Sequence, residues 1–168
     1  LKNKTKLILM KAVILAGGLG KRLRPFTEII PKPLLPVGEK AILEIQIENF
    51  HKHGFDEIYL ATNYKSDYIK NFFGDGSQYG VKLQISKEDI PLGTAGPLML
   101  LRDELTEPFI VMNGDVLSLL DFSKFYTFSL GNKSELTVAI KKIITPYQFG
   151  NIYFKGDYVT KIEEKPVL

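Results

Sequence analysis

Residues 11–25 read KAVILAGGLGKRLRP, and this stretch decides the fold. Its first part, Lys11–Ala16, is a short apolar run with β-branched side chains, which is typical of a strand buried in a parallel sheet. Three glycines and three cations follow within residues 17–24. Glycines let backbone N–H groups approach phosphate oxygens, and cations neutralise a triphosphate. The stretch therefore predicts a phosphate-binding loop after a buried strand, with a plain solvated turn as the alternative.

Two common phosphate-binding motifs do not fit this loop. A dinucleotide-binding G-x-G-x-x-G pattern would need glycine where Leu23 stands. A P-loop ending at Gly20-Lys21 would need glycine at Leu15 and Ser or Thr at Arg22. The loop is therefore neither of these motifs.

The rest of the chain alternates strand and helix patterns. Apolar or alternating runs predict further strands at Glu57–Thr62, Val81–Ser86, Phe109–Met112, Leu136–Lys142, Asn151–Phe154 and Tyr158–Glu163. Helical patterns are expected at Ile42–His53, Asp67–Phe73 with Ser66 as N-cap, Ala95–Leu105 with Thr94 as cap, and Asp121–Leu130. This order predicts an α/β fold with a mostly parallel sheet and a late antiparallel hairpin. In such sheets ligands bind beyond the carboxyl ends of the strands.

Composition narrows the function classes. The 168 residues are 45% hydrophobic and 24% charged, which is ordinary globular usage and excludes intrinsic disorder as the main description. A net charge of +3 is too small to indicate nucleic acid as a partner, and no apolar run is long enough for a membrane helix. Cysteine is absent, so thiolate chemistry is excluded, in agreement with a cytoplasmic enzyme. No heptad repeat or isolated apolar stripe indicates an oligomer interface, so the sequence does not decide whether the protein is a homo-oligomer.

The run EDIPLGTAGPL at residues 88–98 resembles mannose-1-phosphate guanylyltransferases and related heptose or hexosamine enzymes, and six ordered elements resemble the wider sugar-1-phosphate nucleotidyltransferase family. They are the glycine loop with Arg22, PKPLLP at residues 31–36, LGTAG at 92–96, NGD at 113–115, Phe149-Gly150 and EEKP at 163–166. The resemblance implies a Rossmann-like, mostly parallel sheet with flanking helices, C-terminally incomplete. It makes residues 10–168 the N-terminal and central part of the domain, while residues 1–9 are interpreted as a tag or linker.

The resemblance implies transfer of a nucleotidyl group from a nucleoside triphosphate to a sugar 1-phosphate, with release of pyrophosphate. Arg22, Lys32 and Asp115 are then the expected catalytic residues. The expected nucleotide contacts come from the glycine loop and the LGTAG segment: Leu15, Ala16, Gly17, Gly18, Gly20, Lys21, Glu88, Gly93 and Thr94. Lys21 stands where the family usually has Thr. Instead of contacting the phosphates, the Lys21 side chain could point to solvent.

The sugar phosphate is expected to contact a second group of residues, namely Gly114, Phe149, Gly150, Glu164 and Lys165. A solvated strand end is the alternative for Glu164 and Lys165. Asp115 is expected to bind Mg²⁺, which uses one or two carboxylates together with phosphate oxygens and water. A turn cap is its alternative. The family's second aspartate would lie beyond Leu168.

Glu88 is the candidate for reading the base. An ionised carboxylate only accepts hydrogen bonds, and guanine offers two adjacent N–H groups, whereas uracil and thymine place acceptors beside N3–H. The sequence therefore favours GTP. Use of dTTP or UTP is the first alternative, since Glu88 could also be a solvated residue. A non-catalytic relative that only binds nucleotide or regulates is the second.

Overall fold

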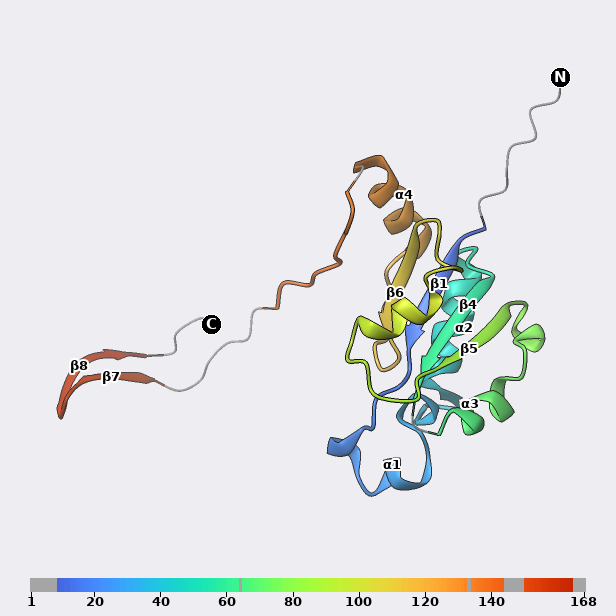
Figure 1. Cartoon of the computed structure of the whole chain (residues 1–168). Helices are drawn as coiled ribbons and strands as arrows, with labels where there is room; N and C mark the ends of the chain where they lie inside the picture. Colours follow the sequence, from blue (N-terminus) through green and yellow to red (C-terminus); the bar gives the residue numbers. More distant parts are fainter. Residues whose placement is uncertain (1–8, 64, 133, 144–149, 165–168) are drawn as a thin grey trace. The chain divides into compact units, whose positions relative to one another are not determined.

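The computed structural model describes residues 9–63, 65–132, 134–143 and 150–164. These residues divide into two compact units, 1–134 and 135–168. The first holds a four-stranded parallel sheet in the order β5-β4-β1-β6, formed by β1 (Lys11–Leu15), β4 (Glu57–Thr62), β5 (Lys82–Lys87) and β6 (Phe109–Asn113) (Figure 1). The parallel α/β fold predicted from the apolar runs is confirmed.

Alternation along β1 assigns side chains to the two faces of the sheet. Ala12 and Ile14 belong to the larger core, whereas Val13 packs on the opposite face with Leu101. Because neighbouring side chains of a strand point to opposite faces, a continuous apolar run fits a strand covered on both sides. The larger core is closed by helices α2 (Ile42–Lys52), α3 (Ser66–Phe73) and α4 (Phe122–Asn132).

Helix α2 follows the predicted periodicity. Leu43, Ile47 and Phe50 are completely buried on one face, and the Phe50 ring stacks on Phe122 of α4 with centroids 4.5 Å apart. At the start of the helix, the Glu44 carboxylate accepts the Ala41 N–H at 3.3 Å. Each fully buried large side chain contributes about 1.5–3 kcal/mol relative to exposure.

Short elements surround these strands and helices. The 3₁₀ turns are η1 (Lys21–Leu23), η2 (Lys32–Leu34), η3 (Ser77–Tyr79) and η4 (Gly96–Leu101), and α1 (Phe26–Ile29) is a single helical turn. β2 (Pro36–Val37) and β3 (Lys40–Ala41) form a small antiparallel pair. The second unit contains the predicted hairpin of β7 (Asn151–Lys155) and β8 (Tyr158–Glu163), which turns at residues 156–157.

Three local predictions were wrong. Leu136–Lys142 forms no strand, because a strand needs a hydrogen-bonded neighbour and none of the described strands pairs with it. The 95–105 segment is not an α-helix: η4 covers only Gly96–Leu101, with Ala95 rather than Thr94 as cap, since Leu98 N–H donates to the Ala95 carbonyl in an i→i+3 bond.

Ser66 does not cap α3 either. It is the first residue of the helix, and the preceding Lys65 has a left-handed backbone (φ 57°) that forms no side-chain cap. A capping serine needs a position just outside the helix with an extended backbone, from which its hydroxyl can reach the N–H groups of the first turn.

Candidate functional site

A cleft of about 570 Å³ lies at the carboxyl ends of the parallel strands. This size is typical of small-molecule sites, and the location is the one expected for ligands of open α/β sheets. Leu15 ends β1 and Ala16 follows it, Asn113 ends β6, and the residues just after β4 and β5 complete the rim. The strand order thus brings together four loops that are far apart in the sequence.

The glycine loop lines the middle of this cleft through Gly17 and Gly18. A Cβ on Gly17 would come within 3.2 Å of Glu88 Oε1, whereas Gly18 has open space around its Cβ position. Both therefore leave backbone accessible where a side chain would fill the cleft. Gly20 and Lys21 were expected here too, but the structure does not place them among the lining residues, and Lys21 is exposed.

Gly20 sets the backbone conformation of the loop. Its backbone is left-handed (φ 60°), and a Cβ there would lie 2.7 Å from Thr27 Cγ2. The Thr27 hydroxyl, which is buried, donates to the Gly20 carbonyl at 3.0 Å. Gly20 thus folds the loop back onto the 26–29 turn, and this aims the following Arg22 at the cleft.

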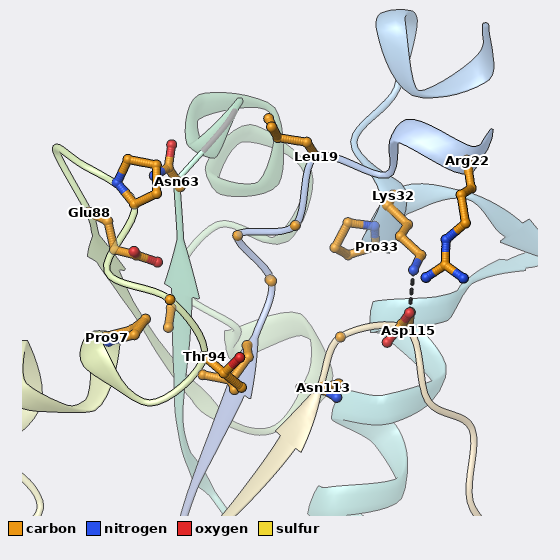
Figure 2. Close-up of a pocket in the computed structure, with 18 residues that line it drawn as sticks. Leu19, Arg22, Lys32, Pro33, Asn63, Glu88, Thr94, Pro97, Asn113 and Asp115 are labelled. Atoms are coloured by element: carbon orange, nitrogen blue, oxygen red, sulfur yellow. Dashed lines mark hydrogen bonds and ion pairs between the residues drawn. The ribbon is translucent and has the colours of Figure 1, made fainter. Parts of the chain in front are cut away.

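The charged residues gather at one end. Figure 2 shows the Arg22 guanidinium and the Lys32 ammonium group side by side, with the Asp115 carboxylate beneath them. Lys32 Nζ donates to Asp115 Oδ2, and both side chains remain partly exposed, at 25% and 39%. The three expected catalytic residues therefore meet in space although up to 93 positions separate them.

The Asp115 carboxylate can bind a metal ion, but the described residues do not surround it with a complete set of protein ligands. In the described part of the chain, no group of three or more His, Cys, Asp or Glu side chains could hold an ion. Mg²⁺ does not need one, because it binds through one or two carboxylates and takes its other ligands from phosphates and water. The donor set present here fits that mode, and in the structure the Asp115 carboxylate pairs with the ammonium group of Lys32.

Glu88 stands at the other end of the cleft. Figure 2 shows it beside Asn63 and Pro97, across the glycine loop from the charged group. Glu88 is only 6% exposed, so it is not a solvated residue, and its Oε2 accepts the Leu92 N–H at 2.8 Å. Among the described residues Oε1 of Glu88 has no hydrogen-bond donor, and because Glu88 lines the cleft, this oxygen can accept a hydrogen bond from a ligand. Gly93 and Thr94, also expected here, line the same cleft.

Gly114 approaches the end of β1 closely. Its N–H donates to the Leu15 carbonyl at 2.8 Å, and a Cβ on it would lie 3.0 Å from the same oxygen. A side chain at this position would therefore crowd the end of β1, and Gly114 also lines the cleft. The sequence did not point to Asn63, although its position directly after β4 was a usable signal.

Of the expected sugar residues, Gly114 lies in the first unit, whereas Gly150 and Glu164 belong to the second. Within it Gly150 and Glu164 are neighbours, because a Cβ on Gly150 would lie 2.9 Å from Glu164 Oε2. Phe149 and Lys165 lie outside the described residues.

A glycine-rich cationic cleft at the edge of a parallel sheet is the architecture of nucleotide-binding α/β proteins. Residues 11–168 match the model of the nucleotidyl transferase family, and the chain belongs to this family.

Individual proteins that are similar to this chain are more specific than the family match. The chain is 41% identical to a probable mannose-1-phosphate guanylyltransferase 1 of Oryza sativa subsp. japonica, over 94% of its own length and 45% of the relative's. It thus spans less than half of the curated relatives that it matches. It resembles HddC from Yersinia pseudotuberculosis complexed with GMP-PN, at 32% identity and TM-score 0.69, covering 93% of this chain and 69% of that one.

A second solved structure carries a different nucleotide specificity in its name. A putative glucose-1-phosphate thymidylyltransferase from Bacillus anthracis matches at 27% identity and TM-score 0.70, covering 94% of this chain and 65% of that one. Among the described residues, no helix is long and apolar enough to span a membrane.

Proposed function

We propose that the protein containing this chain transfers a guanylyl group from GTP to a sugar 1-phosphate, giving a GDP-sugar and pyrophosphate. One observation carries the proposal: a single cleft has cations at one end and a buried carboxylate acceptor at the other. A nucleoside triphosphate has the matching polarity, with anionic phosphates and, in guanine, a base edge that donates hydrogen bonds.

The cationic end serves the phosphates. In nucleotidyl transfer an oxygen of the sugar phosphate attacks the α-phosphorus, and the bond to the departing pyrophosphate breaks. Catalysis of such steps depends on positioning and charge neutralisation rather than on a side-chain nucleophile. Arg22 neutralises the triphosphate and the leaving pyrophosphate, while the backbone at Gly17 and Gly18 gives phosphate oxygens room to approach.

Asp115 and Lys32 form the second part of this end. Asp115 would hold Mg²⁺, with phosphate oxygens as further ligands, and the ion would supply positive charge at the reacting phosphates. Lys32 is paired with Asp115 in the structure. With a cation bound to Asp115, Lys32 would lose this partner and would be available to bind a neighbouring phosphate.

The choice of nucleotide and of sugar phosphate is inferred from Glu88 and from the names of the relatives. Glu88 favours guanine, in line with the guanylyltransferase names of the relatives and with the HddC complex. The likeness to a thymidylyltransferase keeps dTTP as the second candidate. For the sugar phosphate, the relatives' names suggest mannose 1-phosphate, and Gly114, Phe149, Gly150, Glu164 and Lys165 remain its proposed contacts.

Pyrophosphate release tests the proposal in the intact protein. GTP and mannose 1-phosphate are compared with UTP, dTTP and other sugar 1-phosphates. Arg22→Ala is expected to lower kcat/KM about 100-fold or more, the scale seen when one preorganised charge contact is removed. Arg24→Ala is the matched control, because Arg24 lies outside the cleft lining and pairs with Glu28 at 3.8 Å. Equal activity of the two variants would contradict the proposal.

A further inference from the structure

Helix α2 places one buried amide directly under the loop that carries Asp115. Gln46 is 2% exposed, and its Nε2 donates to two main-chain carbonyls, those of Asn113 at 2.9 Å and Val116 at 2.6 Å. These two residues enclose Gly114 and Asp115. A single side chain from another element therefore ties both ends of the turn that presents the carboxylate.

Burying the Gln46 amide has an energetic cost. Gln46 Oε1 is buried and has no hydrogen-bond partner among the described residues. A buried acceptor without a partner destabilises the folded state, and an apolar residue of similar shape would avoid that cost. The polar side chain at this position therefore serves to fix the geometry of the 113–116 turn through the two hydrogen bonds that it donates.

The turn is held from a second side as well. Gly114 N–H bonds to the end of β1, and Val116 N–H donates to the Asn113 carbonyl at 3.2 Å. With its backbone fixed by α2 and β1, the Asp115 side chain can project toward Lys32 as Figure 2 shows. Carboxylate orientation matters for a metal ligand, because partners that orient the ligands commonly change metal affinity when they are mutated.

We propose that Gln46 is a positioning residue that sets the orientation of Asp115 for a divalent cation, acting through the carbonyls of Asn113 and Val116. This inference rests on the proposed function, in which Asp115 binds Mg²⁺. Gln46 itself lies outside the cleft lining and touches no substrate.

Manganese(II) binding to the intact protein, followed by electron paramagnetic resonance of the free ion, tests the inference without turnover. Gln46→Met keeps the length of the side chain and removes both donated bonds. The metal dissociation constant is expected to rise about tenfold. The Mg²⁺ concentration for half-maximal turnover should rise with it, while nucleotide binding measured in EDTA stays unchanged.

Asn49→Leu is the matched control. Asn49 sits one helical turn later and also donates to this loop, to the Ser118 carbonyl at 3.2 Å, but away from Asp115. A purely structural role predicts that the control weakens metal binding as much as Gln46→Met does, and that result, or an unchanged dissociation constant in Gln46→Met, would overturn the inference. Asp115→Asn separates the two proposals: if it too leaves the dissociation constant unchanged, the proposed function fails at the metal ligand.

Gln46→Leu is the second variant, for the case that Gln46→Met does not fold. Its apolar side chain cannot donate to either carbonyl, so the same rise in the metal dissociation constant is expected. Loss of the folded state in both variants, seen by circular dichroism, would assign Gln46 to stability alone and overturn the positioning role.

Discussion

Replacing Glu88 by Gln tests how the cleft distinguishes bases. The carboxylate is buried, and one of its oxygens already accepts the Leu92 N–H. A glutamine oxygen can keep that bond, which leaves an NH₂ group facing the position proposed for the base. Guanine would then meet a donor where it needs an acceptor, whereas thymine and uracil would gain a partner for a carbonyl oxygen.

The structure sets the expected size of this effect. A bidentate contact to a base edge discriminates by about 1–3 kcal/mol, and we expect the lower half, about 1–2 kcal/mol, because the Leu92 N–H shares the carboxylate. This corresponds to roughly a 5- to 30-fold loss of preference for GTP over dTTP.

Thermal stabilisation by each nucleotide measures the effect without catalysis, because a ligand that binds only the native state raises its stability. The ratio of kcat/KM values for GTP and dTTP in the intact protein provides the second readout. Asp89→Asn is the matched control, with the same change of charge at the next residue, which is exposed. Equal stabilisation of the unmodified protein by GTP and dTTP would refute the guanine assignment, and an equal response of the two variants would remove Glu88 from it.

The remaining predictions concern the metal ligand, the loop and acid stability. Asp115→Asn should lower turnover steeply and be partly recovered at high Mg²⁺, whereas an unchanged metal requirement would reassign the residue. Gly20→Ala should destabilise the protein by about 1–2 kcal/mol, because φ is 60° and the added Cβ meets Thr27, while Gly18→Ala should leave the melting temperature nearly unchanged. Burial raises the pKa of Glu57, but hydrogen bonds from Tyr59 and Lys82 and the charge of Lys11 outweigh it and hold the pKa below 4.5. Since the unfolded chain then binds the proton more readily, stability should fall as the pH drops below about 4.5, and chemical denaturation should show a shallower fall in Glu57→Gln.

Local patterns were sufficient for the elements that position the cleft. The run before Ala16 is typical of a strand buried on both faces, and parallel strands place their carboxyl ends at one edge of the sheet. From this rule the glycine loop and Asp115 were expected at the same edge, the resemblance added Glu88, and the structure lines one cleft with all of them. The resemblance to nucleotidyltransferases added their roles, and the family match covers residues 11–168.

Patterns failed where an element depends on a partner elsewhere. The alternation in Leu136–Lys142 is typical of a strand, yet a strand exists only with a neighbour to accept its hydrogen bonds, and alternation says nothing of that neighbour. The 95–105 segment has apolar residues suited to a helix, but its short 3₁₀ turn is set by the i→i+3 bonds it forms after the cleft loop.

Tertiary structure alone decided the contacts that give the cleft its chemistry. Lys32 pairs with Asp115 across 83 positions, and Gln46 reaches the Val116 carbonyl across 70. Neither contact can be predicted from the local sequence. A glutamine on a helix looks like any other polar residue until folding brings a carbonyl oxygen within hydrogen-bond distance of it. The sequence by itself determined which strands end at the cleft. Only the packing of α2 beneath β6 determined how the carboxylate at that strand end is held, since the energy of a long-range hydrogen bond depends on geometry that no local pattern contains.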